Sequence, residues 1–164
     1  MQLNATYKGL ITGGLIIIFY IIVNLLLSTN GSSLAFVSPV IYGLGVVWAI
    51  TSFAKQNGNQ SGFGKLFNQG FKCFIVVTLL VVLYYIIFYK LHPEIIEQSA
   101  TATREHLLKT EKNRTPAEIE QQVQNGKKYF IPMMASITMF QHLIIGAIVS
   151  VATAGVLSLP KKQA

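Results

Sequence analysis

Few residues inside the apolar stretches of this sequence can do chemistry. Asn24 stands in the first stretch, and Gln141 and His142 are neighbours in the last one. A titratable or strongly polar side chain inside a membrane segment is costly, so these three residues form a candidate intramembrane polar site. No Asp or Glu stands in the apolar stretches, so a proton relay through His142 would lack an acidic partner. We therefore favour a histidine that bonds another helix or reaches interfacial water.

Other chemistries have less support in the sequence. The histidines and carboxylates nearest one another do not follow the ligand spacing of a zinc site; they are His92, Glu94, Glu97 and His106. The only cysteine, Cys73, is far along the chain from any histidine, so neither a disulfide nor a cysteine nucleophile is indicated. We expect no catalytic residue, no metal site and no cofactor.

Composition excludes most soluble classes of protein. Of the 164 residues, 52% are hydrophobic and 12% are charged. Soluble domains carry about 25% charged residues. The net charge of +7 comes from basic residues that flank apolar runs, which is typical of membrane proteins and does not indicate nucleic-acid binding. The chain is therefore interpreted as a single integral membrane domain over residues 1–164, with the lipid bilayer as its first partner.

Four apolar stretches are long enough to cross a bilayer, given about 1.5 Å of rise per helical residue and roughly 30 Å of hydrocarbon. They cover residues 10–27, 34–54, 71–89 and 133–159. Pro39 fits either the first turn of the second helix or a kink inside it. Phenylalanines spaced along one face from Phe63 to Phe71 predict a short interfacial helix before the third span.

A polar insertion of residues 91–130 separates the third and fourth stretches. It contains all six acidic residues of the chain. Pro93 followed by two glutamates indicates one helix start, Thr115–Glu118 has the pattern of a capping box, and Gly126 is a stop signal. The sequence thus predicts an all-α fold, a membrane four-helix bundle with a polar helical hairpin between the third and fourth spans.

Small residues recur at four-residue spacing in three of the four stretches. Such spacing lets helix backbones approach closely in a membrane. We expect these residues to pack helices within the protein, and dimerisation is the alternative: Gly9, Gly13, Gly45, Ala49, Gly146, Ser150 and Ala154.

The distribution of basic residues gives a weak orientation signal. Both termini and the loop between the second and third spans share one side, with six basic residues and no acidic ones. The other side has seven basic and six acidic residues, so a count of Lys and Arg does not decide. The basic loop 55–69 against the uncharged turn 28–33 favours cytoplasmic termini and an external hairpin.

Five segments occur in a characteristic order: YKGLITGG at 7–14, SGFGKLFNQGFK at 61–72, YYIIFYKLHPEIIEQ at 84–98, TPAEIEQ at 115–121 and GAIVSVATAGVLSLPKK at 146–162. Their order and spacing resemble a bacterial membrane-protein family catalogued as domain of unknown function 4199. The resemblance implies a small four-span protein with a polar insertion before the last helix, in a bacterial cytoplasmic membrane. It implies no activity, cofactor or catalytic residue.

The sequence therefore favours a non-enzymatic structural or partner-binding module, whose 91–130 hairpin contacts a membrane or periplasmic protein. The alternative is a small transporter or channel subunit, in which Asn24, Gln141 and His142 line a path. Because four spans rarely enclose a path, this alternative requires a homo-oligomer. A membrane enzyme with its groups at the interface is the least favoured hypothesis.

Overall fold

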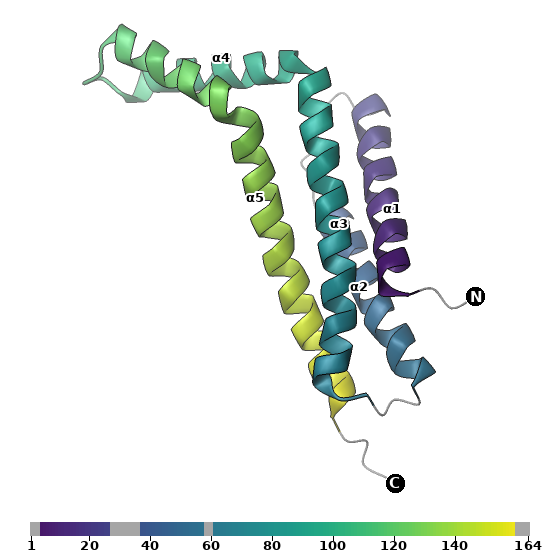
Figure 1. Cartoon of the computed structure of the whole chain (residues 1–164). Helices are drawn as coiled ribbons and strands as arrows, with labels where there is room; N and C mark the ends of the chain where they lie inside the picture. Colours follow the sequence, from purple (N-terminus) through teal and green to yellow (C-terminus); the bar gives the residue numbers. More distant parts are fainter. Residues whose placement is uncertain (1–3, 27–36, 58–60, 160–164) are drawn as a thin grey trace. The chain divides into compact units, whose positions relative to one another are not determined.

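The computed structural model describes residues 4–26, 37–57 and 61–159, with only the backbone described at 24–26. These ranges form five helices and contain no strand (Figure 1), which confirms the all-α class. The helices are α1 (Ala5–Leu26), α2 (Val37–Gln56), α3 (Phe63–Leu91), α4 (Pro93–Thr110) and α5 (Pro116–Ser158). The turn expected at 28–33 lies outside the described residues.

Four of these helices are long and apolar enough to span a bilayer, namely α1, α2, α3 and α5. They also leave large apolar side chains uncovered, for example Ile18 at 54% exposure, Leu79 at 61% and Ile148 at 63%. Exposed apolar surface on this scale suits lipid and not water. Length, composition and surface together indicate a membrane protein.

The helix starts follow local signals in the sequence. Pro39 falls in the first turn of α2, so the first-turn alternative holds for this residue. Pro93 opens α4, as the sequence predicts. The Asn4 side chain caps α1 by accepting a hydrogen bond from the Tyr7 N–H at 3.0 Å. In each case a residue type suited to the first turn decides where the helix begins.

The separate interfacial helix predicted before the third span is wrong. α3 runs without a break from Phe63 to Leu91. Leu66 in its second turn is 1% exposed, and Gly70 lies against Ile50 of α2 and Ser150 of α5. Because these early turns pack against α2 and α5, they form the first part of α3 and not a separate helix.

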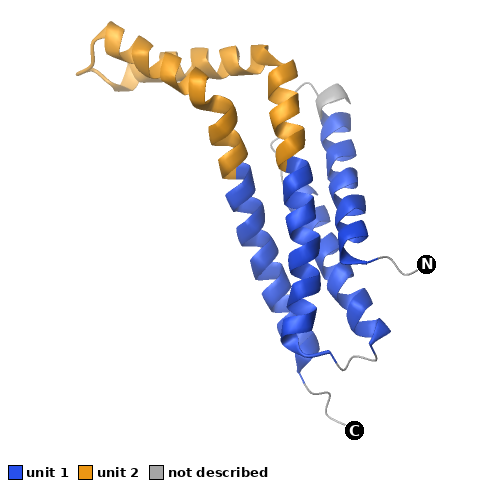
Figure 2. Ribbon diagram, in the orientation of Figure 1, with its two compact units in different colours: residues 1–81, 138–164 blue, residues 82–137 orange. Residues whose placement is uncertain are grey.

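The stop predicted at Gly126 is also wrong, because α5 continues through it to Ser158. A glycine ends a helix when it takes a left-handed conformation, and Gly126 stays helical with open space around its α-carbon. Continuing the helix keeps backbone groups bonded where the chain becomes apolar. Pro132 lies inside α5, and α5 bends in the part that precedes residue 138, drawn in orange in Figure 2.

The chain divides into two compact units (Figure 2). Unit 1 comprises residues 1–81 and 138–164, and unit 2 comprises residues 82–137. Two helices, α3 and α5, pass from one unit into the other. Each unit has contacts of its own and is described by itself.

Glycines allow the helices of unit 1 to approach one another closely. A Cβ atom added to Gly9 would lie 2.8 Å from a backbone oxygen of α3, and one added to Gly13 would lie 2.7 Å from Leu80 Cδ1. A Cβ on Gly45 of α2 would lie 2.8 Å from Thr12 Cβ of α1. α1 therefore approaches both α2 and α3 at points where no side chain fits.

α5 meets α2 and α3 in the same way. A Cβ added to Gly146 would lie 2.6 Å from Phe74 Cγ and would also overlap the Tyr42 hydroxyl. The small residues singled out by their spacing are all buried in unit 1: Gly9, Gly13, Gly45, Ala49, Gly146, Ser150 and Ala154.

The contact at Gly146 yields a stability prediction. Gly146→Ala should lower the free energy of unfolding by about 1–3 kcal/mol, because the new methyl group has to displace Phe74 and Tyr42. Gly155→Ala is the matched control on the same helix, since nothing lies within 4 Å of its added Cβ. It should leave stability unchanged or raise it by up to about 1 kcal/mol. Thermal unfolding of the purified protein in detergent micelles measures both, and equal midpoints would contradict the packing argument.

Candidate functional site

His142 is half-buried in α5 and takes part in a contact between helices. Its Nδ1 lies 2.8 Å from the Thr138 carbonyl oxygen, which can only accept, so Nδ1 carries the proton. The ring packs edge-on against Tyr42 of α2 with 5.1 Å between ring centres. The Tyr42 hydroxyl donates to the His142 carbonyl oxygen at 2.7 Å. His142 is thus bonded within α5 and packed on α2.

The other two members of the predicted polar site do not join His142. Gln141 is exposed whereas His142 is half-buried, so the two neighbours face different directions. Asn24 is in the last turn of α1, and its side chain lies outside the described residues. Within the described ranges, no three His, Cys, Asp or Glu side chains gather closely enough to hold a metal ion.

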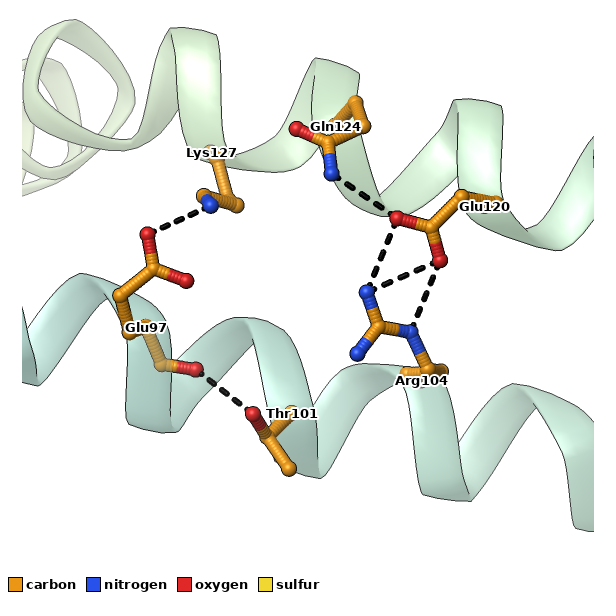
Figure 3. Close-up of polar contacts among 6 residues, drawn as sticks. All are labelled: Glu97, Thr101, Arg104, Glu120, Gln124 and Lys127. Carbon is orange, nitrogen blue, oxygen red and sulfur yellow. Dashed lines mark hydrogen bonds and ion pairs between the residues drawn. The ribbon is translucent and has the colours of Figure 1, made fainter.

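Unit 2 contains a second group of polar residues, on α4 and the start of α5 (Figure 3). Arg104 donates to both oxygens of Glu120, from Nε and from Nη2, at 2.9 Å each. Glu120 also accepts a hydrogen bond from Gln124 Nε2 at 2.8 Å. Lys127 forms an ion pair with Glu97. The two pairs join α4 to α5, and the first has the bidentate geometry that is most specific.

A regular spacing of charges in the sequence could have predicted these pairs. Glu97 and Arg104 are seven residues apart on α4, and Glu120 and Lys127 are seven apart on α5. Seven residues are about two helical turns, so each pair of charges lies on one face. Because both helices carry the acid first, antiparallel alignment places each acid opposite a base.

Neighbouring groups shift the pKa of two charged residues of α4. The Glu120 carboxylate raises the pKa of the Arg104 guanidinium. At the start of α4, the backbone N–H of Glu94 and then the side chain of His92 lower the pKa of the Glu94 carboxyl. This contribution to the helix start is present above the ordinary carboxyl pKa and is lost as pH falls through the lowered value.

A small apolar core lies beneath these polar contacts. Leu107 of α4 and Ile119 and Val123 of α5 are 8%, 3% and 2% exposed, and Ala100 packs against them.

The predicted capping box at the start of α5 is confirmed: the N–H of Thr115 donates to the Glu118 carboxylate at 2.8 Å. The N–H of Glu118 donates back to the Thr115 hydroxyl at 3.3 Å.

A groove runs along one face of α4 and α5 in unit 2. Its volume is about 220 Å³. The lining combines apolar side chains with hydroxyl, amide and ammonium groups, namely Ile96, Ser99, Ala100, Thr103, Gln122, Val123, Gly126, Lys127, Phe130 and Met133. The absence of a side chain at Gly126 leaves space in this groove. The groove suits a protruding apolar side chain flanked by polar groups.

The family described as "Protein of unknown function (DUF4199)" matches residues 7–158 of the chain. The chain belongs to this family. The resemblance expected from the order of its segments is confirmed, and the match to DUF4199 runs from α1 to the end of α5, through both units. No curated protein and no solved structure matches the chain.

A double-mutant cycle tests the pairing in unit 2. Arg104→Met, Glu120→Gln and the double variant should give a favourable coupling free energy that is small but measurable, since both side chains are partly exposed to solvent. Hydrogen exchange of the α4 amides reports the local opening free energy. The matched control is the cycle Arg114→Met with Glu111→Gln, whose 3.5 Å contact joins two residues of the loop between α4 and α5. A control coupling as large as the first would refute the assigned role of Arg104 and Glu120.

Proposed function

We propose that this protein is a non-enzymatic, partner-binding module of the bacterial cytoplasmic membrane. In this proposal α1, α2, α3 and α5 form a four-helix bundle in the bilayer, and α4 with the first part of α5 forms a polar helical hairpin outside it. The observation that carries the proposal is the internal structure of unit 2, with its own apolar core and cross-helix ion pairs. A connection between two spans needs only about 2–8 residues, so this longer segment serves another purpose.

The surface of unit 2 supports a protein as the partner. The groove of about 220 Å³ offers an apolar floor of Ala100 and Val123 with Lys127 at its side. The partner is then a membrane or periplasmic protein that presents an apolar side chain to the groove.

A second candidate is the oligomeric transporter or channel subunit. It is favoured by Gln141, an amide exposed on the apolar part of α5, which would gain a hydrogen-bonding partner from a second copy of the chain. His142→Phe distinguishes the two functions. Loss of solute flux through the protein, with folding intact, would support transport. An unchanged phenotype of the variant would support the partner-binding module.

Topology is tested by labelling with an impermeant thiol reagent in intact cells. Cys73, which is buried, is first replaced by serine, and Ser61→Cys, Thr110→Cys and Gln163→Cys are then made one at a time. The proposal expects labelling at position 110 only, because the hairpin is external and both termini are cytoplasmic. Labelling at 61 and 163 without 110 would reverse the orientation, and labelling at 110 with one of the others would disprove four spans.

Partner binding is tested with two threonines of α4 that make the same local hydrogen bond. The hydroxyl of Thr103 donates to the Ser99 carbonyl oxygen and that of Thr101 to the Glu97 carbonyl oxygen. Thr103 lines the groove, whereas Thr101 is exposed away from its lining. A photoreactive residue at 103 should give one adduct of defined mass in cells, and at 101 it should give none.

The adduct at 103 should disappear when Gly126→Trp fills the groove. Circular dichroism and thermal unfolding of that variant show whether the fold is retained. Equal labelling from positions 101 and 103, or no adduct from either position, would contradict a groove-specific partner.

A further inference from the structure

Lys8 is a buried cation near the start of α1. It is 4% exposed, and its ammonium lies 5.4 Å from the centre of the Trp48 ring on α2. Residues 1–81 and 138–164, which make up unit 1, include no Asp or Glu. A buried charge is costly unless a group of opposite charge or suitable dipoles accompany it. Unit 1 therefore supplies no carboxylate that could act as a counter-ion for Lys8.

A pocket opens beside this lysine, lined by polar side chains and by Ala49 and Phe53. Its volume is about 310 Å³, and its lining includes a second lysine, Lys72 of α3. Side-chain amides and a hydroxyl complete the polar lining, from Asn4, Thr6, Gln56 and Gln69. Ala5 and Thr6 also line it, and they belong to the first turn of α1, whose N–H groups have no partner within the helix. The pocket therefore gathers donors from three helices and two positive charges.

The pocket lies where the apolar stretches end. It is formed by the start of α1, the end of α2 at Gln56 and the part of α3 at Gln69 and Lys72. The predicted hydrocarbon boundaries fall at residues 54 and 71, next to these positions. The first and third apolar stretches begin at residues 10 and 71. Tyr7 and Phe71, which are 54% and 45% exposed, stand just before or at these starts. Exposed aromatic residues of this kind are typical of the headgroup region.

We propose that this pocket binds a phosphate group, with Lys8 as its buried anchor and Lys72 at its rim. Lysine ammonium groups and amide N–H groups donate to phosphate oxygens, and a helix N-terminus favours an anion. Two sources carry this group, an anionic phospholipid headgroup and a free phosphate. The pocket residues stand next to the predicted hydrocarbon boundaries, where lipid headgroups lie, so the lipid is the favoured source. This inference concerns unit 1 and is independent of any partner of unit 2.

Trp48 provides a direct readout, because it is the only tryptophan in the chain and lies beside Lys8. The full-length protein in uncharged detergent micelles is titrated with phosphatidylglycerol, with diacylglycerol of the same acyl chains and with inorganic phosphate, while Trp48 emission is followed. Phosphatidylglycerol should give a saturable change and diacylglycerol none. Saturation by inorganic phosphate at equal or lower concentration identifies free phosphate as the source.

Lys8→Met should raise the midpoint of the phosphatidylglycerol titration by at least about tenfold, which corresponds to about 1.4 kcal/mol. Lys65→Met is the matched control, because Lys65 is exposed on α3 and is not part of the pocket lining. Its midpoint should equal that of the unmodified protein. Lipid retained in native mass spectrometry gives a second readout that does not depend on Trp48.

Equal responses to phosphatidylglycerol and diacylglycerol would overturn the proposal, as would an unchanged midpoint for Lys8→Met. If Lys8→Met does not fold, Lys72→Met decides the matter, since Lys72 is exposed. This variant should bind several-fold more weakly than Lys65→Met. Equal binding by these two variants would refute a phosphate site in the pocket.

Discussion

Close backbone approach at small residues is the constraint on which unit 1 depends. Apolar side chains gain little by facing one another in lipid, so helices associate where their backbones come near enough for dispersion contacts and hydrogen bonds. Gly146 illustrates this. Because it has no side chain, the Tyr42 hydroxyl can reach across to the carbonyl oxygen of His142, and Phe74 fills the remaining space. The position of the one histidine in unit 1 thus follows from a glycine one turn away.

The two units use different physical means of stabilisation. Unit 2 has all the acidic residues and combines a small apolar core with ion pairs and a capping box, as a water-soluble helix pair does. Unit 1 has no acidic side chain, so its buried lysine has no internal counter-ion. This sorting of charge explains why Arg104 is paired within the protein, whereas Lys8 faces a pocket open to an outside anion.

Local sequence signals predicted the helix starts correctly where the groups involved lie within one helical turn. Pro93 and the Thr115–Glu118 capping box mark helix starts, because the groups that satisfy the free N–H groups lie within four residues. The same kind of signal misled at Gly126. A glycine can end a helix but does not require it to end, and the advantage of keeping the backbone bonded near the apolar segment outweighed the local preference.

The sequence by itself determined the number of apolar helices, the all-α class and the polar character of residues 91–130, since these follow from composition, length and periodicity. The family resemblance came from the order and spacing of five segments. Only the tertiary structure decided the pairing of Arg104 with Glu120, the separate directions of Gln141 and His142, and the burial of Lys8 beside Trp48. These features depend on which face each helix turns toward its neighbours. That choice is made by contacts between residues far apart in the chain, which neither local preference nor hydropathy can specify.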